Sequence, residues 1–321
     1  MAQRPIRGKI EPVAFAANVT KTREIPNGLY RGLSLNMVLN CTFDTCTLLT
    51  IDTMIAMIQN LDLTVNGNNS VFKTPLNYWY LMNYIRNQGV LSYDITKTDG
   101  TRDIYLQIDI PFTVPGAYKE EDTMLDIRNA STAVLKIDFG SPVAGMTVNS
   151  GNVYINTDEY IIKDEVLTVG TKEIDYLQQP IERTGKTRVK LPCGFDLNYY
   201  RIVLEVFDSA GARSNAELSE ISLVSGSTVF QVMEASRLQQ QNIVKNKIAA
   251  ASWITGTYEL DMTRGGRMKQ ILGTSDIRNQ LDLILDAAVA DGTANIYLER
   301  IGRDMDTQLG IIKTVQAAQV K

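Results

Sequence analysis

The segments Arg23-Glu-Ile-Pro-Asn-Gly28 and Arg188-Val-Lys-Leu-Pro-Cys-Gly194 decide how this chain is organised, because each leads into an alternating apolar run. The members of these two runs are Leu33, Leu35, Met37 and Leu39 in the first and Tyr200, Ile202, Leu204 and Val206 in the second. Matching features in the same order, about half the chain apart, indicate a structural unit that is used twice. The repeat is too long for a solenoid, so each copy is expected to form a domain with its own core.

Further features repeat in the same order. Leu61-Asp-Leu-Thr-Val-Asn-Gly67 with Val71-Phe72 beyond it is matched by Ile221-Ser-Leu-Val-Ser-Gly226 with Val229-Phe230 beyond it. Each half later carries the same tetrapeptide, as Asp126-Ile-Arg-Asn129 and Asp276-Ile-Arg-Asn279. Side chains two apart in a strand share a face, so Asp126 is expected to pair with Arg128, and Asp276 with Arg278. We interpret these as local structural pairs retained from duplication, with a subunit contact as the alternative.

The alternation of apolar and polar residues predicts antiparallel sheets with one buried and one wet face, and it places Cys41 on a buried face. Each half also contains one helical stretch. In the first half Thr74 is expected to cap a helix that begins at Pro75, and in the second the helix is expected from about Gln231 to Lys247.

These patterns predict an all-β protein of two tandem jelly-roll β-sandwiches, each with a short helix inserted. We expect a basic N-terminal arm at residues 1–10 and a first jelly roll at 11–163. A linker at 164–185 and a second jelly roll at 186–321 are expected to follow.

With these features in this order, the chain resembles the small double jelly-roll major capsid proteins of icosahedral bacteriophages that contain a membrane. That lineage also includes the tectivirus coat proteins and the adenovirus hexon. The resemblance rests on the Arg23–Gly28 lead-in, the Leu61–Gly67 strand before a helix and the Leu125–Asn129 entry to a later strand. The second copy departs from the pattern with Ser225-Gly226 in place of Asn66-Gly67.

The resemblance implies a non-enzymatic coat protein. Three chains with two units each are expected to surround a three-fold axis and form a pseudo-hexameric capsomer. The implied partners are other copies of the chain, penton and minor capsid proteins, and an internal lipid membrane, without specific nucleic acid. The implied location is the virion, after assembly in the host cytoplasm.

Composition limits the chemistry. The chain has 321 residues and a net charge of -4. It contains no histidine, and this absence excludes histidine-based catalytic triads and His-ligated zinc sites. We therefore predict no catalytic, cofactor-binding or metal-binding residues. The alternative function is a cellular two-domain carbohydrate-binding protein or glycan hydrolase built on β-sandwiches. That alternative requires an aromatic platform, and the densest aromatic group, at Tyr78, Trp79, Tyr80 and Tyr84, falls on the predicted helix.

The N-terminal segment is basic, with Arg4, Arg7 and Lys9, and no apolar segment follows it. One hypothesis is that this strandless arm lies beneath a shell and contacts anionic lipid. The alternative is a solvated terminus without a partner.

Overall fold

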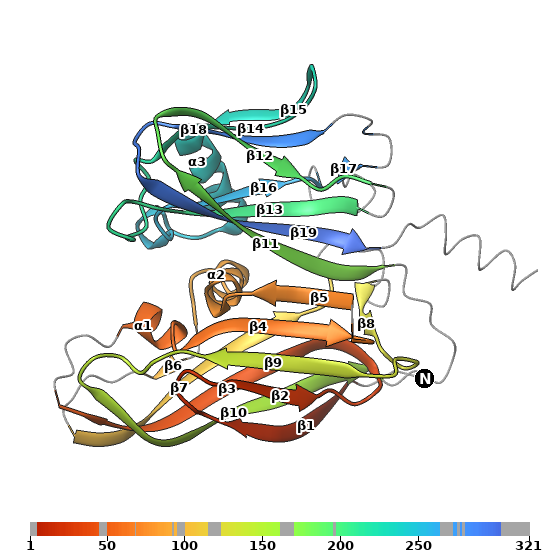
Figure 1. Ribbon diagram of the computed structural model, residues 1–321, viewed down its shortest axis with the longest axis vertical. Helices are drawn as coiled ribbons and strands as arrows, with labels where there is room; N and C mark the ends of the chain where they lie inside the picture. Colours follow the sequence, from red (N-terminus) through yellow and green to blue (C-terminus); the bar gives the residue numbers. More distant parts are fainter. Residues whose placement is uncertain are drawn as a thin grey trace, which may run out of the picture. The chain divides into compact units, whose positions relative to one another are not determined.

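The computed structural model describes residues 5–44, 50–67, 69–91, 93–94, 100–114, 123–160, 170–194, 197–263, 272–274, 277 and 280–302. The chain divides into two compact units, with the main boundary between Thr171 and Lys172. Nearly all regular structure in both units is β-strand (Figure 1), which confirms the predicted all-β fold class. None of the described helices is long and apolar enough to cross a membrane.

The first unit contains ten described strands and two helices. The elements are β1 (Pro5–Ala14), β2 (Thr20–Glu24), β3 (Leu29–Phe43), α1 (Ile51–Ile55), β4 (Ile58–Val65), β5 (Asn69–Thr74), α2 (Leu76–Arg86), β6 (Tyr93–Asp94), β7 (Gly100–Pro111), β8 (Leu125–Asp126), β9 (Ala133–Phe139) and β10 (Met146–Tyr160).

These strands form two antiparallel sheets. One has the order β1-β10-β3-β7, with β6 beside β7 and β8 beside the start of β3. The other has the order β2-β9-β4-β5. Apart from the consecutive pairs β4–β5 and β6–β7, neighbours in each sheet are distant in the sequence, which is the strand order of a jelly roll.

The second unit repeats this plan. The elements are β11 (Thr171–Ile181), β12 (Gly185–Leu191), β13 (Leu197–Phe207), β14 (Leu218–Ser225), β15 (Thr228–Glu234), α3 (Ala235–Asn246), a 3-10 turn (Ala250–Ser252), β16 (Thr257–Asp261), β17 (Leu272–Gly273), β18 (Leu281–Ala287) and β19 (Gly292–Gly302). One sheet has the order β11-β19-β13-β16 with β17 beside β13, and the other has the order β12-β18-β14-β15.

Nine strands of the first unit, all except β6, correspond in order to the nine described strands of the second. Both units place a hairpin directly before a helix, β4–β5 before α2 and β14–β15 before α3. The next main strand after the helix, β7 or β16, lies beside β3 or β13. β8 pairs with the start of β3, as β17 does with the start of β13. The predicted pair of tandem jelly rolls with an inserted helix is therefore confirmed.

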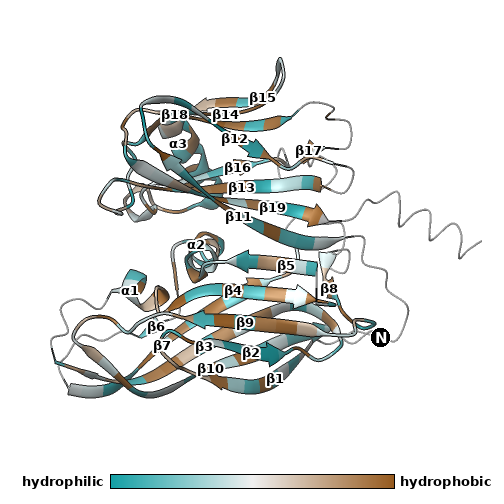
Figure 2. Ribbon diagram, in the orientation of Figure 1, coloured by the Kyte–Doolittle hydropathy of each residue, from teal (hydrophilic) through white to brown (hydrophobic). Residues whose placement is uncertain are grey.

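Alternation determines which face of each strand is buried. Every second residue of β3, from Leu33 to Phe43, is buried, and Cys41 is fully buried among them. Figure 2 shows the same alternation of hydrophobic and hydrophilic positions along the strands. The second unit has its own core, in which Ile202, Leu204 and Val206 of β13 pack with residues of the opposite sheet.

A tyrosine fixes the entry to the long central strand in both units. Tyr30 donates its hydroxyl to the carbonyl of Pro26 at 2.7 Å, and Tyr199 donates to the carbonyl of Pro192 at 2.6 Å. Both rings are buried. This contact explains why the two proline-containing segments precede alternating strands, and the sequence analysis did not identify it.

The helix starts differ from those expected. Thr74 is the last residue of β5 and is buried, and Pro75 is the N-cap of α2 without a side-chain cap hydrogen bond. The proline side chain has no hydrogen-bond acceptor, so it cannot cap the free N–H groups of the first helical turn. In the second unit α3 begins at Ala235, because the residues before it extend the β14–β15 hairpin.

The domain limits also differ from the expected ones. Residues 5–10, expected in a strandless arm, belong to β1 and pair with β10 from Pro5 opposite Tyr160 onward. Residues 171–181, expected in a linker, form β11 of the second unit. In both cases the many polar residues of the strand weaken the alternation that would identify it in the sequence.

Candidate functional site

A groove of about 600 Å³ lies on the outer face of the first unit's β1-β10-β3-β7 sheet. The register aligns two rows of outward-facing residues across the four strands. One row is Lys9, Asn156, Ser34 and Asp109, and the other is Arg7, Asp158, Gly32 and Pro111. We call this the Gly32 groove.

Glycine keeps the floor of the groove low. A Cβ atom on Gly32 would lie 2.8 Å from the carbonyl oxygen of Ile110, so no larger residue fits without displacing the backbone. Beside it, the hydroxyl oxygen of Ser34 is buried and has no hydrogen-bond partner in the described part of the chain. This hydroxyl is therefore available to water or to another molecule that enters the groove.

Basic side chains border the groove. Arg7 and Lys9 of β1, Arg31 of β3 and Arg86 at the end of α2 line it together with two carboxylates. Arg7 and Lys9, two of the three expected arm residues, are exposed on a paired strand. The third, Arg4, lies outside the described residues.

Each helix is attached to its sheet by one asparagine. The Asn83 side chain donates to the carbonyl of Asp109 at 2.6 Å and accepts from its N–H at 2.9 Å. In the second unit Asn242 makes the same two bonds with Glu259, both at 2.8 Å. Asp109 and Glu259 are thus equivalent positions, and so are Arg86 and Lys245, each three residues after its asparagine.

The corresponding face of the second unit is closed by ion pairs. Arg201 lies 2.6 Å from a carboxylate oxygen of Glu299 and 3.2 Å from one of Glu259. Lys172 pairs with Glu299 at 3.0 Å, and Lys245 pairs with Glu259 at 2.8 Å. Burial acts to raise the pKa of Glu259, but Arg201 and Lys245 hold the net pKa below its usual range.

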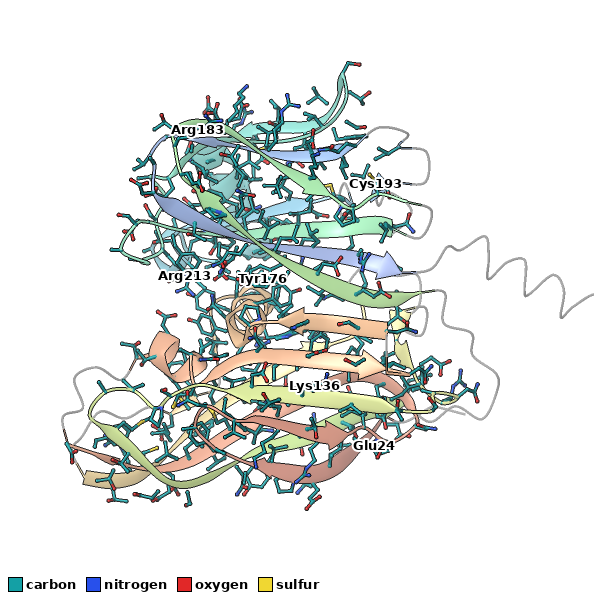
Figure 3. The ribbon with its side chains drawn as sticks, in the orientation of Figure 1. Glu24, Lys136, Tyr176, Arg183, Cys193 and Arg213 are labelled. Carbon is teal, nitrogen blue, oxygen red and sulfur yellow. The ribbon has the colours of Figure 1, made fainter. Side chains whose placement is uncertain are left out.

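A second group of polar residues lies on the same sheet, next to these ion pairs. Glu205 is fully buried, accepts from the Tyr297 hydroxyl at 2.7 Å and pairs with Arg213 at 3.4 Å. The ring of Tyr176 stacks on that of Tyr297. Burial and the Glu205 carboxylate raise the pKa of Tyr297 well above its ordinary value. Figure 3 labels Tyr176 on β11 and Arg213 in the loop after β13.

Asp126 and Arg128 form an ion pair at 2.6 Å, and the Arg128 N–H also bonds to Asp126. The pair arises in a turn that follows β8, rather than along an extended strand as the sequence analysis assumed. Asp276 and Arg278 lie outside the described residues. Ile127 and Ile277, at the centres of the two tetrapeptides, both pack toward a core.

The groove presents polar and charged groups to another molecule. The groove is lined by amides, guanidinium groups, an ammonium group and carboxylates. The residues described form no cluster of three metal-ligating side chains. Tyr78 and Trp79, which the carbohydrate alternative needs on a surface, are fully buried in α2.

Solved structures share this arrangement of two units. The chain matches a crystal structure of the STIV MCP with a TM-score of 0.78 at 14% sequence identity, over 95% of this chain and 98% of that chain. The fold is the double jelly roll of major capsid proteins.

Two further structures share the double jelly roll. The atomic structure of Sulfolobus Turreted Icosahedral Virus matches with a TM-score of 0.76 at 14% identity, over 98% of this chain and 95% of that chain. The crystal structure of the major capsid protein P2 from Bacteriophage PM2 matches with a TM-score of 0.64 at 14% identity, over 92% and 97% of the two chains. Neither a protein-family model nor a curated protein sequence matches the chain.

Proposed function

We propose that this protein is the major capsid protein of an icosahedral virus and that it acts as a structural, non-enzymatic subunit. The observation that carries the proposal is the match of both jelly rolls, in order, to the STIV MCP over 95% of this chain and 98% of that chain. The likeness therefore includes both units and leaves little of either chain unmatched.

The proposed assembly is a homotrimer. Two similar units per chain become six around a three-fold axis, and six similar units fit a site of six-fold environment in a closed shell. The duplicated topology supports this arrangement, because both units offer equivalent sheet faces and edges. Further contacts between capsomers, and with penton and minor capsid proteins, belong to the same proposal, as do location in the virion and assembly in the host cytoplasm.

An internal membrane beneath the shell is a separate part of the proposal. Its support is the basic N-terminal segment, of which Arg4 precedes β1 while Arg7 and Lys9 belong to it. Particles of an Arg4→Glu variant are expected to retain less anionic lipid than wild-type particles. Equal lipid content in the two would remove this part of the proposal and leave the capsid role untouched.

Mass photometry of the purified protein tests the assembly. The expected mass is about 107 kDa, three times the 35.7 kDa chain, with a large and permanent interface. Electron microscopy of the same material should show six-lobed particles. A stable monomer that binds or cleaves a glycan would overturn the capsid proposal in favour of the carbohydrate-active alternative.

A further inference from the structure

We propose that the Gly32 groove of the first unit receives a patch of the second unit from another copy of the chain. This patch, the β15–α3 patch, consists of Glu220, Val229, Val232, Glu234 and Arg237. The inference rests on the proposed capsid function and names the surfaces through which one chain contacts the next.

The groove lacks an ion that its counterpart contains. By strand register and the asparagine anchors, Gly32 corresponds to Arg201, Asp109 to Glu259, and Asp158 to Glu299. In the second unit Arg201 bridges the two glutamates. In the first unit Gly32 leaves that position empty, and neither Asp109 nor Asp158 forms an ion pair within the described part of the chain.

Three basic residues of the rim also lack counterions. Among the described residues Arg7, Lys9 and Arg86 form no ion pair, whereas Lys245, the counterpart of Arg86, is paired with both Glu259 and Asp261 at 2.8 Å. The groove therefore has a basic rim and an acidic floor. A partner that suits it carries carboxylates at its edge and a cation at its centre.

The β15–α3 patch has complementary charges. Glu220 and Glu234 lie directly opposite each other on β14 and β15, and neither is paired in the part of the chain that the structure describes. Like charges directly opposite on a sheet are destabilising unless a cation compensates them. Arg237, in the first turn of α3, is exposed and also forms no ion pair there.

The patch also exposes apolar area on an edge strand. Val229 is 60% exposed and Val232 is 52% exposed. By register they lie opposite Val224 and Ser222, on the same face of the sheet as Glu220 and Glu234. An edge strand with two exposed valines is a site for association with another chain. The second unit therefore has a surface suited to burial in an assembly.

A second copy explains both surfaces with one contact. The groove and the patch are different surfaces of the chain, so the contact is head-to-tail, and a head-to-tail contact related by a three-fold rotation closes into a trimeric ring. A lipid headgroup suits these surfaces less well. Its phosphate would meet the basic rim but also Asp109 and Asp158, and it would leave Val229 and Val232 exposed.

Charge exchange tests the contact. The E220K/E234K variant and the R7E/K9E variant are each expected to weaken the trimer about a hundredfold, because like charges then face each other. Combining all four substitutions restores opposite charges and should restore the trimer. Structural damage to either unit would not be repaired by the other pair of substitutions, so recovery identifies the contact.

Matched controls use exposed basic residues on strands that belong to neither surface. K21E/K73E, on β2 and β5 in the other sheet of the first unit, should leave the trimer mass unchanged, and so should Arg183→Ala, whereas Arg237→Ala should weaken the trimer. Mass photometry across a dilution series gives the readout, with circular dichroism to confirm folding. Binding to phosphatidylserine vesicles is measured in parallel on the same variants.

The outcomes separate this contact from the proposed function. A wild-type trimer that neither charge-reversed variant weakens would overturn the contact and leave the capsid proposal intact. Loss of vesicle binding by R7E/K9E with an unchanged trimer would assign the groove to lipid and also overturn it. A monomeric wild-type protein would contradict both.

Discussion

Asn83 and Asn242 hold the same position in the two jelly rolls, and each pairs its side-chain amide with the backbone of an acidic residue on the neighbouring strand, β7 or β16. Each helix is thereby attached to the last main strand of its sheet. These anchors define which residues of the two units correspond, and therefore where Gly32 replaces Arg201.

Replacing the anchor should destabilise one unit at a time. Asn83→Ala leaves the N–H and carbonyl of Asp109 without their partner, and we expect a loss of about 1–3 kcal/mol in the free energy of unfolding. The fluorescence of Trp79 reports on the first unit in a Trp253→Phe background, since the chain has two tryptophans. Asn87→Ala, at an exposed position of the same helix end, is the control. Equal stability of the two variants would contradict the anchoring role.

The hydrogen bond from tyrosine to proline should contribute about the same free energy of unfolding in each unit, and less than the asparagine anchor contributes. Tyr30→Phe and Tyr199→Phe each remove one hydroxyl and leave a proline carbonyl without its donor, which should cost about 1 kcal/mol. Urea unfolding of both variants measures the loss. Tyr105→Phe is the control, because Tyr105 is 40% exposed and makes no hydrogen bond within the described residues. If all three variants unfold at the same urea concentration, the contact does not stabilise the entry to the strand.

The Glu259 network should make the second unit sensitive to acid. The folded-state pKa of Glu259 is lowered, despite the raising effect of burial, by Arg201 and Lys245. A carboxylate with a lowered folded pKa stabilises above its unfolded pKa, and that stabilisation is lost as pH falls through the folded value. We therefore expect the difference in free energy of unfolding between the wild type and Glu259→Gln to shrink as the pH falls from 7 to about 3.

Trp253 fluorescence in a Trp79→Phe background follows this unit during urea unfolding at each pH. Glu182→Gln is the control, because Glu182 is exposed and unpaired in the described part of the chain. The difference in free energy of unfolding between the wild type and this variant should stay nearly constant over the same pH range. A constant difference between wild type and Glu259→Gln across this range would show that the carboxylate is not stabilised by its ion pairs.

Truncation at the N-terminus should distinguish a strand from an arm. Deleting Met1–Lys9 removes the part of β1 that pairs with β10 from Pro5 to Lys9, so the first unit should unfold at a lower urea concentration. Deleting Met1–Arg4 leaves β1 whole and should not change that concentration. If the longer deletion has no effect on Trp79 unfolding, β1 contributes nothing to the stability of the unit.

The sequence by itself determined the fold class and the duplication. Alternation of residues such as Leu33 to Phe43 depends only on strand geometry, so the buried face could be read directly. The repeated segments occur in the same order in both halves, and this order predicts two jelly rolls. The limits of β1 and β11 could not be predicted, because strands rich in polar residues resemble loops and linkers in a sequence.

Only the tertiary structure decided which side chains meet. Asn83 and Asp109 are 26 positions apart, and Arg201 and Glu299 are 98 apart. No local pattern links such residues, since their contact depends on strand order and register across the sheet. The Gly32 groove is of the same kind: its floor and rim come from four strands and one helix, and its open position appears only when the register of one unit is compared with that of the other.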